Sequence, residues 1–85
     1  MKQFDYIIKD ELGIHARPAG LLVKEAGKFA SAINIAKGEK KADAKKIFGL
    51  MGLGVKCGDT VTTTAEGADE DSAIAALEEF MKATW

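Results

Sequence analysis

The sequence predicts an α+β fold in which an antiparallel sheet carries its helices on one face. Segments of strand and helix character follow one another in the order β-α-β-β-α-β-α. The predicted strands are short and polar on one side, which disfavours a sheet covered on both faces. At 85 residues the chain can build one modest hydrophobic core, so we expect a single domain over residues 1–85.

The first two predicted elements are a strand and an amphipathic helix. Residues 2–9 (KQFDYIIK) alternate apolar and polar side chains, as a half-buried strand does. Residues 16–28 have apolar side chains at helical spacing, although Gly20 and Gly27 weaken this helix. The predicted apolar face of the helix consists of Ala19, Leu22, Val23, Ala26, Phe29 and Ala30.

The middle of the chain predicts a hairpin and a short helix. Residues 32–36 (AINIA) alternate again, and Gly38 marks a turn into a short strand over residues 40–44. Residues 47–54 (IFGLMGLG) contain too much glycine for a long helix, so we expect one or two turns.

The last two elements are a strand and a helix. Residues 60–67 (TVTTTAEG) are β-branched and alternating, which predicts a strand. Asp69 is a candidate N-cap for the final helix, with Glu70 and Asp71 in its first turn, where the helix dipole favours acids. The buried stripe of this helix is predicted to consist of Ala73, Ile74, Leu77, Phe80 and Met81.

Composition and charge exclude several classes of function. No apolar run approaches the ~20 residues that span a bilayer, and no signal peptide is recognisable, so we expect a cytoplasmic protein without membrane insertion. The lone Cys57 excludes an internal disulfide, and no metal or cofactor site is expected. A net charge of −1 disfavours nucleic acid as a partner. Lysines gather in residues 37–46 and acids in residues 66–79, which indicates either solvated faces or steering of acidic partners.

The stretch GIHARPAG, residues 13–20, contains the chain's only His and only Pro and is suited to holding an anion. With His15 at the N-cap of the following helix, the backbone N–H groups of Ala16 and Arg17 lack helical partners. Pro18 falls in the first turn, where its missing N–H costs no helical hydrogen bond. The guanidinium of Arg17 is suited to phosphate oxygens.

These features fit an imidazole that carries a phosphoryl group. A neutral ring nitrogen is a nucleophile, and the helix end together with Arg17 disfavours the cationic ring. An attached phosphate would find N–H donors and positive potential. We expect no metal ligand and no second carboxylate to converge on His15. The residues alone leave an alternative open, in which His15 only closes a turn and Arg17 is an ordinary surface charge.

The segments GIHARPA, VKEAGKF, ADAKKIFGLMGLGVKCGD and AEGADEDSAIAAL resemble the HPr family in order and spacing, over nearly the whole chain. HPr is the histidine-containing phosphocarrier of the bacterial phosphoenolpyruvate-dependent sugar phosphotransferase system. The resemblance implies an open-faced β-sandwich of four antiparallel strands with three helices on one side. It also implies a carrier rather than an enzyme, which accepts phosphate from enzyme I on Nδ1 of its active His and passes it to enzyme IIA.

The resemblance assigns roles to individual residues. His15 matches the phosphorylated His, Arg17 matches the Arg that contacts the phosphate, and the backbone N–H of Ala16 is expected to reach the phosphate. Both partners are expected to dock on one surface, here called the docking patch, made of Gly20, Leu21, Lys24, Ile47, Phe48 and Met51. Three large apolar residues on one or two helical turns are not easily all buried, although capping of a small core is the alternative. Lys45 and Lys46 flank the patch and are expected to contact acidic partner surfaces.

Two departures from the family pattern bear on regulation and branch. In HPr proteins of low-GC Gram-positive bacteria, a Ser before the Ile of the short helix is phosphorylated by a kinase, and here that position is Lys46. Lysine cannot take that phosphate and is a poor N-cap, so we expect the switch to be absent; neither Ser31 nor Ser72 matches it. Leu12 stands where Ser or Thr is frequent in sugar-type HPr, and a Leu-Gly-x-His-Ala-Arg-Pro run also occurs in the nitrogen-branch carrier that resembles HPr, although the IFGLMGLG helix is more similar to the sugar branch. The nitrogen branch and a regulatory binding module of the same fold remain alternatives. We expect a monomer, because transient docking needs a free His15 face.

Overall fold

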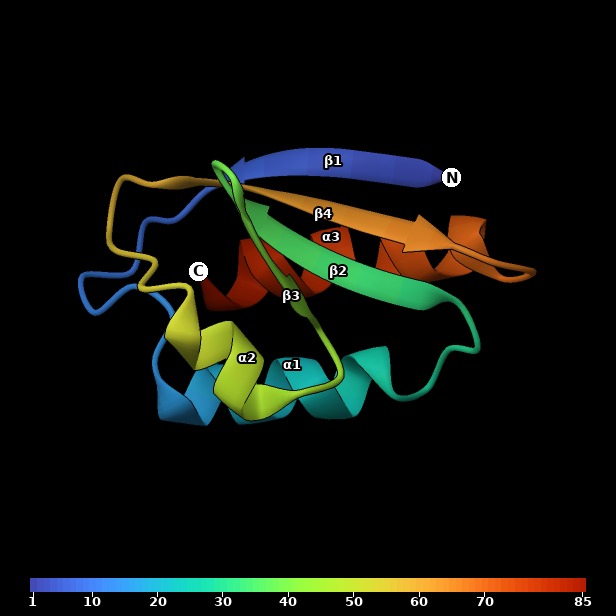
Figure 1. Ribbon diagram of the computed structural model, residues 1–85, viewed down its shortest axis with the longest axis horizontal. Coiled ribbons are helices and arrows are strands. Elements are labelled where there is room, and N and C mark those ends of the chain that lie inside the picture. Colours follow the sequence, from blue (N-terminus) through green and yellow to red (C-terminus); the bar gives the residue numbers. More distant parts are fainter.

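The computed structural model describes all residues 1–85 and contains four strands and three helices in the predicted order. They are β1 (Lys2–Ile7), α1 (Ala16–Ala26), β2 (Ala32–Lys37), β3 (Lys40–Asp43), α2 (Ile47–Gly52), β4 (Thr60–Glu66) and α3 (Glu70–Thr84). The strands form one sheet in the order β1-β4-β2-β3, and every neighbouring pair is antiparallel. Figure 1 shows the three helices on the same side of this sheet. The predicted α+β architecture is confirmed, and none of the helices has the length and apolar character needed to cross a membrane.

The core lies between the sheet and the helices because strand side chains alternate between the two faces. In β4, for example, Val61, Thr63 and Ala65 are buried, whereas the threonines between them are partly exposed. The helices cover this face with Ala19, Leu22 and Ala26 of α1 and with Ala73, Leu77 and Met81 of α3. Of the remaining residues predicted to be buried on α3, Ile74 and Phe80 are partly exposed.

Trp85 belongs to the core, which the sequence analysis did not anticipate. Its side chain is only 4% exposed, and its ring meets that of Phe80 edge to face at a centroid distance of 6.0 Å. Trp85 lies four residues after Met81, and its N–H donates to the Met81 carbonyl at 2.8 Å, so it continues the buried stripe of α3 at helical spacing.

The first strand and the first helix each end two residues earlier than predicted. The strand predicted over residues 2–9 ends at Ile7, because the N–H of Ile8 donates to Asp59 and that of Lys9 to Trp85, outside the sheet. The helix predicted over residues 16–28 ends at Ala26, and a tighter turn follows, in which Lys28 and Phe29 donate to carbonyls three residues back. Ala30 lies beyond this turn and is exposed, so its predicted place on the buried face is wrong.

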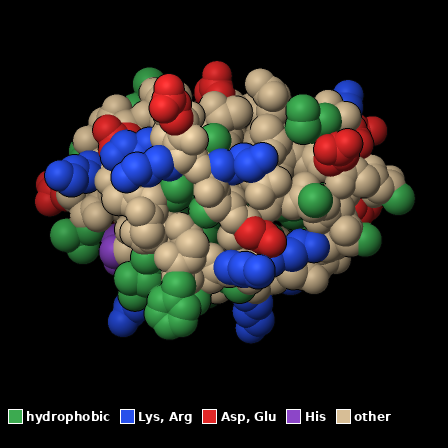
Figure 2. Space-filling model, in the orientation of Figure 1, with side chains coloured by type: hydrophobic (Ala, Val, Ile, Leu, Met, Phe, Trp, Pro, Cys, Tyr) green, Lys and Arg blue, Asp and Glu red, His purple; other side chains and the backbone are tan.

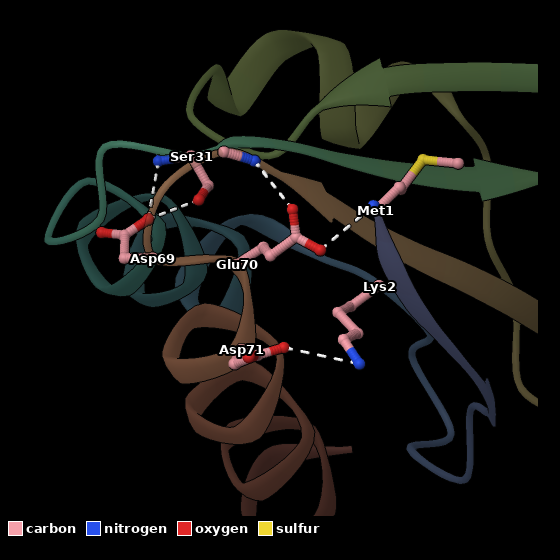
Figure 3. A network of polar contacts seen from close by, with 7 residues as sticks. Met1, Lys2, Ser31, Asp69, Glu70 and Asp71 are labelled. Atoms are coloured by element: carbon pink, nitrogen blue, oxygen red, sulfur yellow. Dashed lines mark hydrogen bonds and ion pairs between the residues drawn. The ribbon is translucent and has the colours of Figure 1, made fainter.

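Asp69 occupies the predicted N-cap position of α3, but its side chain does not cap the helix. Its carboxylate instead accepts the N–H groups of Ala30 and Ser31, each at 2.9 Å, and the Ser31 hydroxyl, as Figure 3 shows in part. The hydroxyl, followed by the Ala30 N–H, holds the pKa of Asp69 below its usual value. Beside it, the Glu70 carboxylate pairs with the N-terminal ammonium of Met1 at 3.0 Å. These contacts fasten the segment before β2, and the start of β1, to the start of α3.

Candidate functional site

The segment between β1 and α1 is held in place at both ends. The N–H of Lys9 donates to the backbone oxygen of Trp85 at 2.9 Å, and that of Ile14 to the carbonyl of Val55 at 3.2 Å. Gly13 has a φ of +66°, and a Cβ there would lie 2.2 Å from the Val55 carbonyl oxygen. Only glycine fits this position without moving the backbone, and the close approach fixes where α1 begins.

His15 occupies the N-cap position of α1, as predicted, with extended backbone angles (φ −124°, ψ 177°). Its carbonyl accepts the N–H of Ala19 at 3.0 Å, the first hydrogen bond of the helix. The N–H groups of Ala16 and Arg17 therefore precede the hydrogen-bonded part of the helix, and the buried Pro18 has no N–H. No acidic residue lies in this first turn, so the positive end of α1 is not neutralised from within the helix. The imidazole makes no capping bond and is 34% exposed.

The structure brings one carboxylate close to His15, that of Asp10, which the sequence pattern did not predict. Oδ2 of Asp10 lies 3.7 Å from Nε2 of His15. The other carboxylate oxygen accepts the N–H of Leu12 at 2.8 Å, and the Asp10 carbonyl accepts the N–H of Gly13 at 2.9 Å. An Asp two residues before an N–H that it binds is a recognisable turn signal. Its approach to the ring depends on how the whole loop closes, which the sequence does not show.

The docking patch is assembled where α2 packs against α1. A Cβ at Gly20 would meet Cδ1 of Ile47 at 3.7 Å, so the Ile47 side chain of α2 lies directly over Gly20 of α1. Figure 2 shows apolar side chains gathered beside and below the imidazole, with Lys and Arg side chains around them. The large apolar side chains that are exposed here are Leu21 at 52%, Phe48 at 87% and Met51 at 42%.

Leu12 adds to the exposed apolar surface near His15, although the sequence analysis treated it only as a departure from the family pattern. Its side chain is 71% exposed on the loop that precedes α1. A single leucine in a polar turn carries no periodic signal, so only the folded loop reveals its exposure.

The two lysines before α2 differ in what their side chains do. Lys45 is partly buried, and its Nζ donates to the carbonyl of Phe29 at 2.8 Å. Its ammonium thus ties the start of α2 to the turn after α1, a contact that the sequence analysis did not anticipate. Lys46 occupies the N-cap position of α2 without a side-chain capping bond and is exposed, as is Lys24 on α1.

Together these features define a class of protein that presents one reactive side chain on an open surface. The imidazole stands at a helix N-terminus beside exposed apolar and cationic side chains, and no group of three or more His, Cys, Asp or Glu side chains is placed to bind a metal ion. Such a site is suited to reaction with a group that another protein brings to it.

Comparisons with known proteins identify the family. A family model described as "PTS HPr component phosphorylation site" matches residues 2–83. Phosphocarrier protein HPr of Mycoplasma capricolum is 44% identical over 81 residues, which cover 95% of this chain and 91% of that protein. The chain belongs to the HPr family of phosphocarrier proteins of the phosphotransferase system.

Solved structures agree with this assignment. A mycoplasma histidine-containing phosphocarrier protein superposes with a TM-score of 0.95 at 43% identity, with 98% of this chain and 94% of that chain covered. An HPr dimer from Thermoanaerobacter tengcongensis superposes with a TM-score of 0.77 at 47% identity, with 98% and 95% covered. At these identities the likeness extends beyond the fold to the family.

Proposed function

We propose that this chain accepts a phosphoryl group from phospho-enzyme I on Nδ1 of His15 and passes it to an enzyme IIA of a sugar phosphotransferase system. The observation that carries this proposal is the position of His15. Its imidazole is 34% exposed at the start of α1, where the first turn offers backbone N–H groups and contains no acid. A dianionic phosphoryl group on the ring is stabilised by such donors and by the helix dipole.

The chemistry requires little beyond these groups. The lone pair of Nδ1 attacks phosphorus, and the backbone N–H of Ala16 and the guanidinium of Arg17 stabilise the oxygens. Both transfers take place at active sites that the partners complete. The chain is therefore a stoichiometric carrier in the cytoplasm, built as a single domain over residues 1–85, rather than a free-standing enzyme.

Both partners dock on the same patch in this proposal. Phe48, 87% exposed, is the best candidate for the central apolar contact, because truncation of large exposed side chains at interface centres is often costly. The exposed ammonium groups of Lys24 and Lys46 face acidic partner surfaces, while Lys45 supports α2 through its bond to Phe29. Transfer uses the monomer, because this patch must be free to dock. A relative that was solved as a dimer makes the oligomeric state worth measuring.

The kinase switch of the low-GC Gram-positive relatives is absent at position 46 in this proposal. The residue at the N-cap of α2 is Lys46, which has no hydroxyl and carries a positive charge. A phosphoserine there would add negative charge to the docking patch, whereas the lysine adds the opposite sign permanently.

Intact-mass spectrometry tests the proposal. The protein is incubated with enzyme I, phosphoenolpyruvate and magnesium, beside a His15→Ala variant and an acid-treated sample. One added phosphate that is labile to acid and lost in the variant is the expected result. Running the enzymes I of the sugar and nitrogen branches in parallel identifies the donor. No adduct with either enzyme, when both charge another HPr, would refute the carrier function.

A further inference from the structure

We propose that Asp10 is a positioning residue for His15, whose carboxylate keeps the ring proton on Nε2 and so leaves the lone pair on Nδ1. This inference rests on the proposed function, because it explains how the nucleophilic nitrogen is made available. The observation behind it is the 3.7 Å approach of Oδ2 of Asp10 to Nε2 of His15, made by the one carboxylate that pairs with the ring.

The Asp10 carboxylate is fixed before the ring reacts. One of its oxygens is occupied by the N–H of Leu12 at 2.8 Å, and the Asp10 carbonyl accepts the N–H of Gly13 at 2.9 Å. The preceding residue, Lys9, is fastened to the backbone oxygen of Trp85 at 2.9 Å. The remaining oxygen is therefore held toward the imidazole, and little side-chain entropy is lost when the two groups interact.

A neutral imidazole carries its proton on one nitrogen and a lone pair on the other. A carboxylate opposite Nε2 attracts an N–H there and repels a lone pair, so it favours the tautomer with the proton on Nε2. The nucleophilic lone pair then belongs to Nδ1. The separation of 3.7 Å is longer than a hydrogen bond in this state, as is frequent in catalytic sites before the reaction partner binds.

The transfer step balances without loss of a proton. The Nδ1 lone pair forms a bond to phosphorus while the bond between phosphorus and the phosphate-bearing atom of the donor breaks, and that electron pair returns to the donor. The Nε2 proton stays in place, so the phosphorylated ring carries a formal positive charge. Asp10 faces this charge on one side of the ring, and the first turn of α1 faces the phosphoryl oxygens on the other. Transfer to the acceptor reverses these steps, and the Nε2 proton again stays.

The chain contains a matched control for the turn that Asp10 makes. Asp43 accepts the N–H of Lys45 on its side chain at 2.8 Å and the N–H of Lys46 on its carbonyl at 3.0 Å. The same turn thus precedes α2, but without an imidazole opposite the carboxylate. Asp10→Asn and Asp43→Asn each retain an acceptor oxygen for the turn and remove one negative charge, and only the first change lies beside His15.

The experiment measures the tautomer directly by long-range ¹H–¹⁵N correlation spectra of the ring in the neutral, unphosphorylated protein. The unsubstituted protein is expected to carry its proton on Nε2. In Asp10→Asn the ratio of the Nδ1–H to the Nε2–H tautomer rises about fivefold, the upper range for a partly exposed charged contact, and the rate of phosphorylation by phospho-enzyme I falls. Asp43→Asn changes neither the ratio nor the rate.

Two results would overturn this role of Asp10. One is an Asp10→Asn protein with an unchanged tautomer ratio, and the other is an equal change in Asp43→Asn, which would show a general effect of charge or of the turn. The tautomer is read without any phosphate donor. A chain that takes no phosphate would therefore refute the proposed function while the spectra still decide what Asp10 does to the ring.

Discussion

Gly13→Ala should destabilise the protein far more than an ordinary glycine substitution. An alanine held at the φ of +66° found here pays about 1 kcal/mol relative to glycine. Its Cβ would also lie 2.2 Å from the carbonyl oxygen of Val55 and 2.8 Å from the Cα of Lys56. These are backbone atoms, which cannot rotate away as a side chain can. Relief requires moving the carbonyl that binds Ile14, so we expect a total loss of about 3 kcal/mol in the free energy of unfolding, or about 15 °C in Tm.

Gly38→Ala is the matched control for this substitution. Gly38 has a φ of +60°, but a Cβ there would meet no atom within 4 Å. The Gly38→Ala variant should therefore lose only the conformational cost, about 1 kcal/mol in the free energy of unfolding. Denaturant unfolding followed through the fluorescence of Trp85, the only tryptophan, measures both variants. If Gly13→Ala loses no more free energy of unfolding than Gly38→Ala, the steric argument is wrong.

Three further predictions concern stability and docking. Gly20→Ala should raise the free energy of unfolding by about 1 kcal/mol, because the new methyl meets Ile47 at an ordinary contact distance of 3.7 Å and alanine favours the helix; a lower Tm would contradict this. Because folding lowers the pKa of Asp69 from 3.8, its contribution to stability is complete well above that pH and is lost as the pH falls through the lower folded value. Unfolding measured from pH 6 to pH 2 should therefore show a shallower decline for Asp69→Asn than for the unsubstituted protein, and parallel curves would refute the assignment. Phe48→Ser should leave the free energy of unfolding within about 0.5 kcal/mol, since the side chain is 87% exposed, yet slow phosphoryl transfer about tenfold. Ile7→Ser, at an exposed apolar residue of the sheet, is the control and should not slow transfer.

The sequence predicted the position of His15 at a helix start, but not the residues that surround it. A His before Ala-Arg-Pro predicts a helix start with free N–H groups, and the structure places His15 there. Asp10 lies five residues earlier in a polar turn, and its distance from the ring follows from bonds that Lys9 and Ile14 make to distant segments. The same holds for Lys45, whose side chain reaches back to Phe29 across the fold.

Asp69 illustrates a local rule that a long-range contact overrides. Its position one residue before α3 was predicted correctly, but its carboxylate serves Ala30 and Ser31, which lie 39 and 38 residues away. Backbone N–H groups in a partly buried turn need a partner, whereas the exposed start of α3 can use water. A capping preference considers only residues that are close in sequence, so it cannot predict that distant N–H groups will bind the same carboxylate.

The sequence by itself determined the order of the elements and most of the residues that become buried, and it predicted the position of the His that we propose as the phosphoryl carrier. These properties depend on the periodicity of apolar side chains and on local backbone chemistry, both of which act over a few residues. Only the tertiary structure decided the carboxylate beside His15 and the backbone groups that Asp69 and Lys45 bind. Each of these depends on which distant segments pack together, and packing is a property of the whole chain rather than of any window along it.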